Sequence, residues 1–207
     1  MEEKLISVNV KRLQGATRYE TNLAILNEAG TEGNEILVCT GLNFADGLSA
    51  SAVNRPILLV RNSLTAEQKT FLEGIDNAKI YIIGGEAAVT LRTENELNEF
   101  GSVERIYGAN RYETSVNIAK EFFPNAKYAV LAYGQNFPDG LSGGPLAKNM
   151  NAPLLLSYNT RSDYAKAYAE SIGIRSGVVL GGSGLISDKS VNMIFALGNQ
   201  KIIVSTR

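Results

Sequence analysis

The stretch Arg12-Leu13-Gln14-Gly15-Ala16-Thr17-Arg18-Tyr19-Glu20-Thr21 returns 93 residues later as Arg105-Ile106-Tyr107-Gly108-Ala109-Asn110-Arg111-Tyr112-Glu113-Thr114, with seven of ten positions identical. The same spacing carries Gly41-Leu42-Asn43-Phe44-Ala45-Asp46-Gly47-Leu48-Ser49 onto Gly134-Gln135-Asn136-Phe137-Pro138-Asp139-Gly140-Leu141-Ser142. Two motifs that return in the same order at one fixed spacing indicate a structural unit that is used twice. We therefore predict two tandem repeats, residues 5–101 and 102–207.

The composition is that of an ordinary globular protein. Of 207 residues, 44% are hydrophobic and 20% are charged, and the net charge is −1. This balance excludes a disordered or fibrous chain and gives no general attraction to nucleic acid or to anionic membranes. No stretch approaches the roughly 20 apolar residues that a membrane helix needs, and the start, residues 1–4, is not a signal peptide. We expect either a cytosolic protein or a piece of a processed or longer one.

The chain contains no histidine and one cysteine, Cys39. Ser-His-Asp and Cys-His catalysis and imidazole metal sites are therefore excluded, and only carboxylates and lysines remain for acid, base or ligand roles. Cys39 lies in an apolar run that is typical of a buried strand, so we expect it to be a packing residue. We expect neither a cofactor nor a metal.

Apolar runs alternate with helical patterns along both repeats. Thr17 with Glu20, and Asn110 with Glu113, form capping boxes that predict a helix after each opening motif. Alternation of this kind is typical of an α/β fold with a parallel sheet flanked by helices. The predicted strands are 5–13, 36–39, 56–60, 80–83, 128–131, 153–156 and 178–180, and the later predicted helices are 65–74, 94–99, 163–172 and 188–197. Residues 201–205 stand where 104–108 stood, without the arginine motif, and are predicted to form a closing strand.

These motifs resemble the type-2 cell-wall-binding repeat of clostridial and related Gram-positive surface proteins. The resemblance rests on the Arg-x-x-Gly-x-x-Arg-Tyr-Glu-Thr opening, the Asn-Phe-x-Asp-Gly-Leu-Ser turn, the Pro-Ile-Leu-Leu run and the Gly-Gly after a hydrophobic strand, all in both copies. It covers nearly the whole chain. The second copy departs from the pattern at Leu154, which replaces isoleucine.

The resemblance implies a non-catalytic module with a small Toprim-like or Rossmann-like three-layer α/β fold. Such modules fix surface proteins to the Gram-positive cell wall by binding an anionic secondary cell-wall polymer, and they usually pack in threes as a pseudo-threefold ring. With two repeats here, a ring requires a third module or a homo-oligomer. The polymer is thought to lie near the Pro-Ile-Leu-Leu segments, which correspond to Pro56, Ile57, Leu58 and Leu59, and to Pro153, Leu154, Leu155 and Leu156.

Arg18 and Arg111 lie in the first turn of their predicted helices, where the helix dipole disfavours a cation. One interpretation is an ion pair within each repeat, to Asp46 and to Asp139. The other is direct contact with a phosphate or another anion, because the guanidinium fork suits both partners.

Asn43 with Asp46, and Asn136 with Asp139, have the spacing of a helix cap at the carboxyl end of a strand. That edge of a parallel sheet is where open α/β folds bind ligands, so a sugar or phosphate site is the functional interpretation and capping is the structural one.

Two other functions are compatible with the sequence. A purely structural surface or self-assembly module would share every feature above. An Mg²⁺-dependent phosphoryl-transfer enzyme would use Asp46 and Asp139, although such chemistry needs several carboxylates converging on the ion and each repeat offers one.

Overall fold

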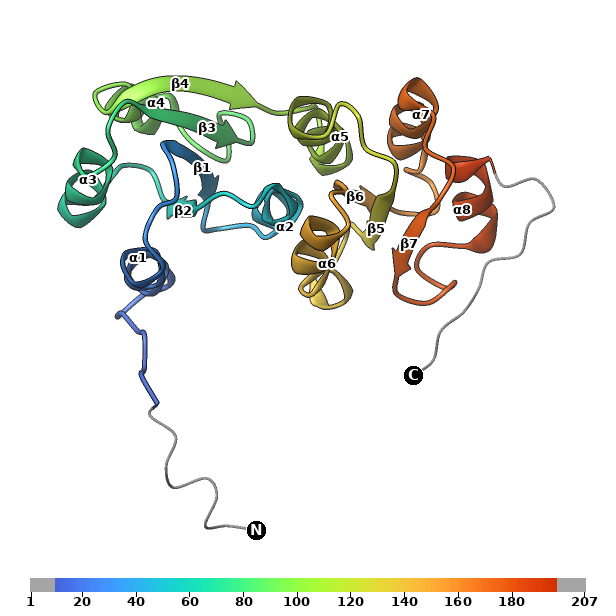
Figure 1. Ribbon diagram of the computed structural model, residues 1–207, viewed down its shortest axis with the longest axis horizontal. Coiled ribbons are helices and arrows are strands. Elements are labelled where there is room, and N and C mark those ends of the chain that lie inside the picture. The colour runs from blue at the N-terminus through green and yellow to red at the C-terminus, as the bar shows by residue number, and fades with distance from the viewer. Residues whose placement is uncertain (1–9, 197–207) are drawn as a thin grey trace, which may run out of the picture.

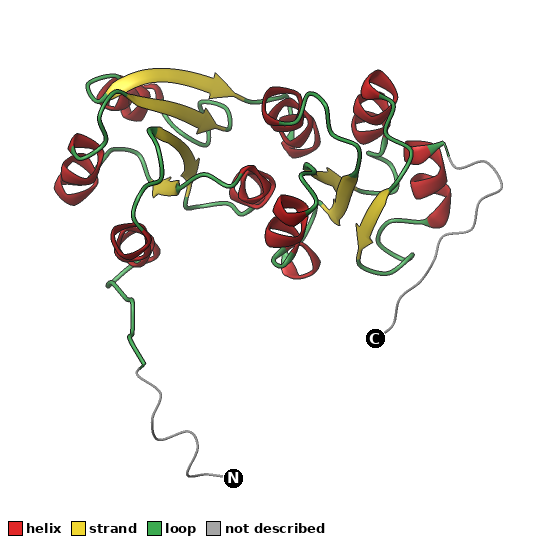
Figure 2. Ribbon diagram, viewed as in Figure 1, coloured by secondary structure: helices red, strands yellow, loops and turns green. Residues whose placement is uncertain are grey.

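The computed structural model describes residues 10–196 and shows two parallel sheets, each flanked by helices (Figures 1 and 2). The predicted α/β class is confirmed. The first sheet has the strand order β2-β1-β3-β4 and the second the order β6-β5-β7. The elements that build the first sheet are α1 (Arg18–Ala29), β1 (Glu35–Thr40), α2 (Ala45–Ala50), the 3₁₀ turn η2 (Ser51–Val53), β2 (Ile57–Val60), α3 (Ala66–Glu73), β3 (Ala78–Ile83), α4 (Leu91–Leu97) and β4 (Gly101–Ile106).

The second repeat follows the same order. Its elements are α5 (Arg111–Phe122), β5 (Ala129–Tyr133), the 3₁₀ turn η3 (Pro138–Gly140), α6 (Gly143–Asn149), β6 (Leu154–Ser157), α7 (Asp163–Ile172), β7 (Gly177–Leu180) and α8 (Asp188–Phe195). The sequence boundary predicted between residues 101 and 102 falls at the start of β4, which pairs with β3 in the first sheet and then leads directly into α5.

The first helix of each repeat begins at its predicted cap. Glu20 Oε2 accepts a hydrogen bond of 2.9 Å from the backbone N–H of Thr17, which completes the capping box of α1. Asn110 Oδ1 accepts from the N–H groups of Tyr112 and Glu113 at the start of α5. Glu113 Oε2 accepts from the backbone N–H of Ala109, whereas a capping box would have it accept from the N–H of Asn110. The second capping box is therefore shifted by one residue.

The two faces of the first sheet belong to two different cores. Ile36, Val38, Ile80 and Ile82 pack in a core within the first repeat. The alternate residues, Leu37, Cys39, Tyr81 and Ile83, belong to a core that continues through the second repeat. Helix α2 contacts α5 and β6, and α6 contacts η2. The repeats therefore share one continuous hydrophobic core, and burial raises the pKa of the Cys39 thiol in it.

Three predictions about the elements need correction or lie outside the described residues. The helix expected at 94–99 is α4, which begins earlier because the Thr90 hydroxyl accepts from the N–H of Thr93. Residues 10–13 are not in a strand. Their equivalent in the second repeat, β4, is a strand because it pairs with β3 of the first sheet, and the part of the chain described has no sheet before residue 10 with which they could pair. Residues 5–9 and the predicted closing strand at 201–205 lie outside the described residues.

Candidate functional site

The two motif arginines donate to equivalent backbone carbonyls. Arg18 Nη1 donates to the carbonyl of Gly41 at 2.6 Å, and Arg111 Nη1 donates to that of Gly134 at 2.7 Å. These carbonyls lie just past the carboxyl ends of β1 and β5. The predicted ion pairs with Asp46 and Asp139 are wrong, because the described residues include no carboxylate within 4 Å of either guanidinium. A guanidinium has five N–H donors, so each arginine keeps donors for another partner.

Glycine is required where each arginine binds. A Cβ atom on Gly41 would lie 2.3 Å from the Tyr19 ring, and one on Gly134 would lie 2.5 Å from the Tyr112 ring. The tyrosine of each opening motif therefore packs directly on the glycine whose carbonyl its neighbouring arginine binds. This contact explains why the Arg-Tyr pair and the Gly of the turn motif occur together in both repeats.

Arg111 also reaches the first repeat. Its guanidinium carbon lies 5.3 Å from the ring centroid of Phe44, within the range of a cation–π interaction. The Phe44 and Phe137 rings, which occupy equivalent turns, have centroids 5.5 Å apart. The two turn motifs and one arginine thus form a contact between the repeats.

The motif aspartates face the Gly-Gly motif of their own repeat. A Cβ atom on Gly84 would lie 2.7 Å from Asp46 Oδ2, and one on Gly181 would lie 2.7 Å from Asp139 Oδ2. Both glycines have positive φ, +115° and +104°. The first glycine of each Gly-Gly motif therefore has a backbone conformation that L side chains rarely adopt and is closely approached by an aspartate. The contact between this glycine and the aspartate was not predicted from the sequence.

The position of Asp46 in the fold changes the pKa of its carboxyl group. Burial raises the pKa of Asp46 to about 6, and the nearby Arg111 guanidinium lowers it in part. The helix caps predicted at Asn43 and Asn136 are not formed, because Phe44 and Phe137 are the N-cap residues of α2 and η3 and neither helix start has a side-chain cap bond. The asparagine side chains instead accept from backbone N–H groups close by in the turns. Asn43 Oδ1 accepts from Ala45 N at 3.2 Å, and Asn136 Oδ1 accepts from Phe137 N at 2.9 Å.

The Pro-Ile-Leu-Leu segments differ in burial between the repeats. In β2, Ile57 and Leu59 are half-buried, whereas Leu58 is fully buried. In the second repeat Leu154, Leu155 and Leu156 are all buried, and so is Pro153. The carbonyls of Pro56 and Pro153 accept from Leu37 N and Val130 N, so each proline begins the strand pairing.

Asn22 is a site residue that the sequence analysis missed. Its Nδ2 donates to the carbonyl of Ile57 at 2.9 Å, and its Oδ1 accepts from Leu59 N at 2.8 Å, which satisfies the outer edge of β2. Ser115 holds the equivalent position and its Oγ accepts from Leu156 N. The signal available was the four-residue spacing from Arg18, which places Asn22 on the same face of α1.

A pocket of about 770 Å³ lies between the repeats, and we call it the inter-repeat pocket. Five predicted site residues line it, namely Arg18, Asn43, Ile57, Leu59 and Arg111, together with Asn22, Thr40, Gly41, Leu42, Phe44, Gly47, Gln135 and Phe137. The remaining predicted residues are not in its lining: Asp46, Pro56, Leu58, Asn136, Asp139, Pro153, Leu154, Leu155 and Leu156. Two guanidinium groups, amide side chains and two phenyl rings, contributed by both repeats, therefore line the pocket.

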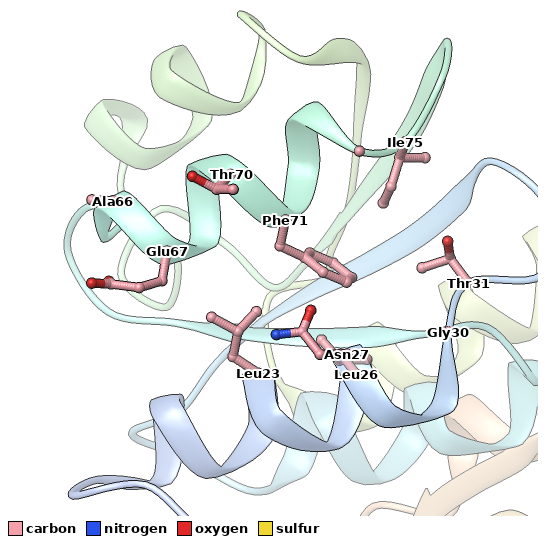
Figure 3. Close-up of a pocket in the computed structure, with 11 residues that line it drawn as sticks. Leu23, Leu26, Asn27, Gly30, Thr31, Ala66, Glu67, Thr70, Phe71 and Ile75 are labelled. Atoms are coloured by element: carbon pink, nitrogen blue, oxygen red, sulfur yellow. The ribbon is translucent and has the colours of Figure 1, made fainter.

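A second pocket, of about 600 Å³, lies between α1 and α3 (Figure 3). Its sides carry Leu23, Leu26, Phe71 and Ile75, and it contains none of the predicted site residues. In the second repeat Tyr168 stands where Phe71 stands, and its hydroxyl donates to the carbonyls of Ala119 and Phe123. This tyrosine joins α7 to α5, a link that α3 and α1 lack.

The described residues include no group of three or more His, Cys, Asp or Glu side chains placed to hold a metal ion. None of the helices from residue 10 to residue 196 is long and apolar enough to cross a membrane.

The family model for cell wall binding domain 2 (CWB2) matches residues 12–94 and 105–191. The chain belongs to the CWB2 family. Each match lies within one of the two repeats, so membership identifies a tandem pair of cell-wall-binding repeats and indicates a cell wall or extracellular location.

Relatives and solved structures agree with this assignment. The chain is 32% identical over 193 residues to N-acetylmuramoyl-L-alanine amidase LytC of Bacillus subtilis, covering 90% of this chain and 39% of LytC. It is 32% identical over 202 residues to the amidase enhancer of the same organism, covering 95% of this chain and 28% of the enhancer. The chain thus spans well under half of either relative.

The fold is shared with two proteins of Clostridium difficile. Cwp6 superposes with a TM-score of 0.79 at 24% identity, covering 94% of this chain and 32% of Cwp6. Cwp8 also gives a TM-score of 0.79 at 24% identity, covering 95% of this chain and 36% of Cwp8. Nearly the whole of this chain therefore shares its fold with about a third of each of those proteins.

Proposed function

We propose that this CWB2 pair is a non-catalytic anchor that binds an anionic secondary cell-wall polymer of a Gram-positive envelope in the inter-repeat pocket. The observation that carries the proposal is that Arg18 and Arg111, from different repeats, line one pocket without a carboxylate partner among the described residues. Each guanidinium is fixed by one bond to a strand-end carbonyl and keeps its other donors for an anion.

The remaining lining suits a sugar polymer that carries negative charge. Asn43 and Gln135 offer amide donors and acceptors for hydroxyl groups, and Phe44 and Phe137 offer apolar surface. Within the lining, the half-buried Ile57 and Leu59 contribute apolar contacts. We do not include Leu154, Leu155 and Leu156 in the proposed site, because they are buried.

A binding role is favoured over phosphoryl transfer by the surroundings of the aspartates. Asp46 and Asp139 lie against Gly84 and Gly181 of their own repeats, and neither belongs to a group of three or more His, Cys, Asp or Glu side chains placed to hold a metal within the described residues. Metal-dependent phosphoryl transfer relies on several oxygen ligands around the ion. The amidase activity in the name of LytC belongs to a protein of which this chain covers 39%.

Cosedimentation with purified Gram-positive cell walls tests the proposal, before and after chemical removal of the anionic polymer and at two salt concentrations. We expect binding that is lost with the polymer and weakens as salt rises, because ion pairing at an exposed pocket is screened. Equal binding to stripped walls would overturn the polymer as ligand, and binding to neither preparation would overturn the anchor function of this pair.

We also propose that the pair associates with a further CWB2 repeat. Leu48 of α2 is 7% exposed where it packs on the second repeat, but its equivalent Leu141 is 63% exposed. Conversely, Ile118 of α5 is 2% exposed, whereas its equivalent on α1, Ile25, is 47% exposed. Leu141 in the second repeat and Ile25 in the first are therefore exposed at positions whose equivalents are buried. A third repeat or a second copy of the chain would bury them in a contact like the one that joins the two repeats.

A further inference from the structure

The space between α1 and α3 is open in the first repeat, whereas the second repeat fills the equivalent space with its own side chains. The pocket of Figure 3 shares Leu23, Asn27 and Glu67 with an adjoining pocket of about 610 Å³. The two pockets therefore form one continuous groove, which we call the α1–α3 groove. In the second repeat α7 packs against α5, and the packing of α3 against α1 is less extensive.

The size of the buried side chains explains why only one of the two spaces is open. Helices α1 and α5 are equivalent at a spacing of 93 residues, and α3 and α7 at a spacing of 97, that of Pro56 and Pro153. Three alanines are fully buried on α5 and α7: Ala119, Ala165 and Ala169. The equivalent residues on α1 and α3 are larger and are also buried: Leu26, Gln68 and Leu72. Because the side chains between two helices set how closely they approach, the larger set holds α3 away from α1.

Two tyrosines of α7 fill the equivalent space in the second repeat. The Tyr164 hydroxyl accepts a hydrogen bond of 3.0 Å from Asn110 Nδ2 at the start of α5. Tyr168 is 1% exposed, and its hydroxyl donates to the carbonyls of Ala119 and Phe123 at the end of the same helix. Phenol groups therefore close this space at both ends of α5.

The first repeat lacks both phenol groups but keeps their surroundings. Glu67 stands in place of Tyr164, and Phe71, whose ring has no hydroxyl, stands in place of Tyr168. Figure 3 shows the Phe71 side chain pointing from α3 toward α1. The counterparts of the three residues that bind the tyrosine hydroxyls all line the groove: Thr17, Leu26 and Gly30. The groove is therefore a preformed space at the place where the second repeat holds two phenol rings.

We propose that the α1–α3 groove binds tyrosine side chains of a partner polypeptide. Leu23, Leu26 and Phe71 offer apolar surface for a ring, and the Asn27 amide and the carbonyls at the end of α1 offer acceptors for its hydroxyl. Glu67 is the one charged residue lining the pocket of Figure 3, so a neutral ring enters without burying a charge. The groove shares no lining residue with the inter-repeat pocket, and the two sites are separate.

Titration of the unmodified chain with N-acetyltyrosinamide, followed by NMR of the backbone amides, tests the proposal. We expect saturable shifts at Leu23, Asn27 and Phe71, with a Kd on the order of 1 mM for a ligand of this size. N-acetylphenylalaninamide keeps the ring and the backbone but lacks the hydroxyl, so it should bind about three- to tenfold more weakly.

A double variant of the first repeat gives the matched comparison. Glu67→Tyr with Phe71→Tyr places the residues of the second repeat on α3, and the tethered rings should raise the Kd for N-acetyltyrosinamide at least about fivefold by competing within the groove. Glu121→Tyr adds a tyrosine on α5, outside the groove, and should leave that Kd unchanged.

Three results would overturn the proposal: no saturable shifts in the groove, equal affinity for the two ligands, or an unchanged Kd in the folded double variant. The first two need only the unmodified chain, so they decide the matter even if the double variant does not fold. Shifts of the same amides that appear with rising protein concentration alone would assign the groove to a second copy of the chain, which would also overturn the proposal.

Discussion

The guanidinium of Arg111, which opens the second repeat, lies 5.3 Å from the ring centroid of Phe44 in the turn of the first repeat. Arg111 therefore serves the contact between repeats as well as the pocket, whereas Arg18 bonds within its own repeat. Both glutamine variants lose a bond to a backbone carbonyl, but Arg111→Gln also loses the cation–π contact and should lower the free energy of unfolding by about 1 kcal/mol. Arg18→Gln should change it by less than about 0.5 kcal/mol, as is usual for exposed substitutions. Urea unfolding of both variants checks the difference, and equal losses would contradict it.

Leu48 and Leu141 hold equivalent positions in opposite surroundings. Leu48→Ala removes a buried side chain from the contact between the repeats and should cost about 2–4 kcal/mol of unfolding free energy. Leu141→Ala should leave stability nearly unchanged and instead weaken association with a further repeat. Denaturant titration measures the first effect, and sedimentation velocity over a range of concentrations measures the second. A chain that stays monomeric at all concentrations would indicate that the missing repeat is supplied by a different chain.

Asp46 should make stability depend on pH. Its pKa is raised to about 6 in the folded chain from an ordinary value of 3.8, mainly by burial. Between these values the folded state binds more protons than the unfolded state, so stability falls as pH rises from about 4 to 6 and then levels off. Asp46→Asn should make the decrease in unfolding free energy between about pH 4 and pH 6 smaller by on the order of 1–2 kcal/mol. Unfolding free energies at pH 4, 5, 6 and 7 test the sign, and a rise over this range that Asp46→Asn abolishes would contradict it.

Gly84 should tolerate no side chain. It has φ of +115°, and a Cβ atom there would lie 2.7 Å from Asp46 Oδ2 and 3.0 Å from the Ala88 Cβ. Gly84→Ala should therefore cost about 1–3 kcal/mol. Gly182→Ala is the control, because no atom lies within 4 Å of its added Cβ. Similar Tm values for the two variants would show that the contact between Asp46 and Gly84 does not constrain the turn.

The order of elements follows from the sequence because local signals agree with one another. Apolar runs, the capping residues Thr17 and Asn110, and the repeat itself all indicate alternating strands and helices. The site was harder to predict. The bonds from Arg18 and Arg111 to carbonyls depend on where β1 and β5 end in space, which spacing along the chain does not report.

The differences in burial between the two repeats could not be predicted from the sequence either. Ile57 is half-buried and Leu154 is buried, although both follow a proline in the same motif. The first repeat packs its α2 on β6, and no repeat within the described residues packs on β2 in that way. Burial that depends on a neighbouring repeat does not appear in the pattern of either copy alone.

The measurement that tests the central claim most directly is the affinity of purified anionic cell-wall polymer for the unmodified chain and for Arg18→Gln, with Arg55→Gln as a control. Arg55 pairs with Glu35 and is not in the lining of the inter-repeat pocket. The account predicts that Arg18→Gln raises the Kd about tenfold, a loss of about 1.4 kcal/mol, while Arg55→Gln and the Tm of both variants change little. An unchanged Kd for Arg18→Gln would contradict polymer binding at the inter-repeat pocket.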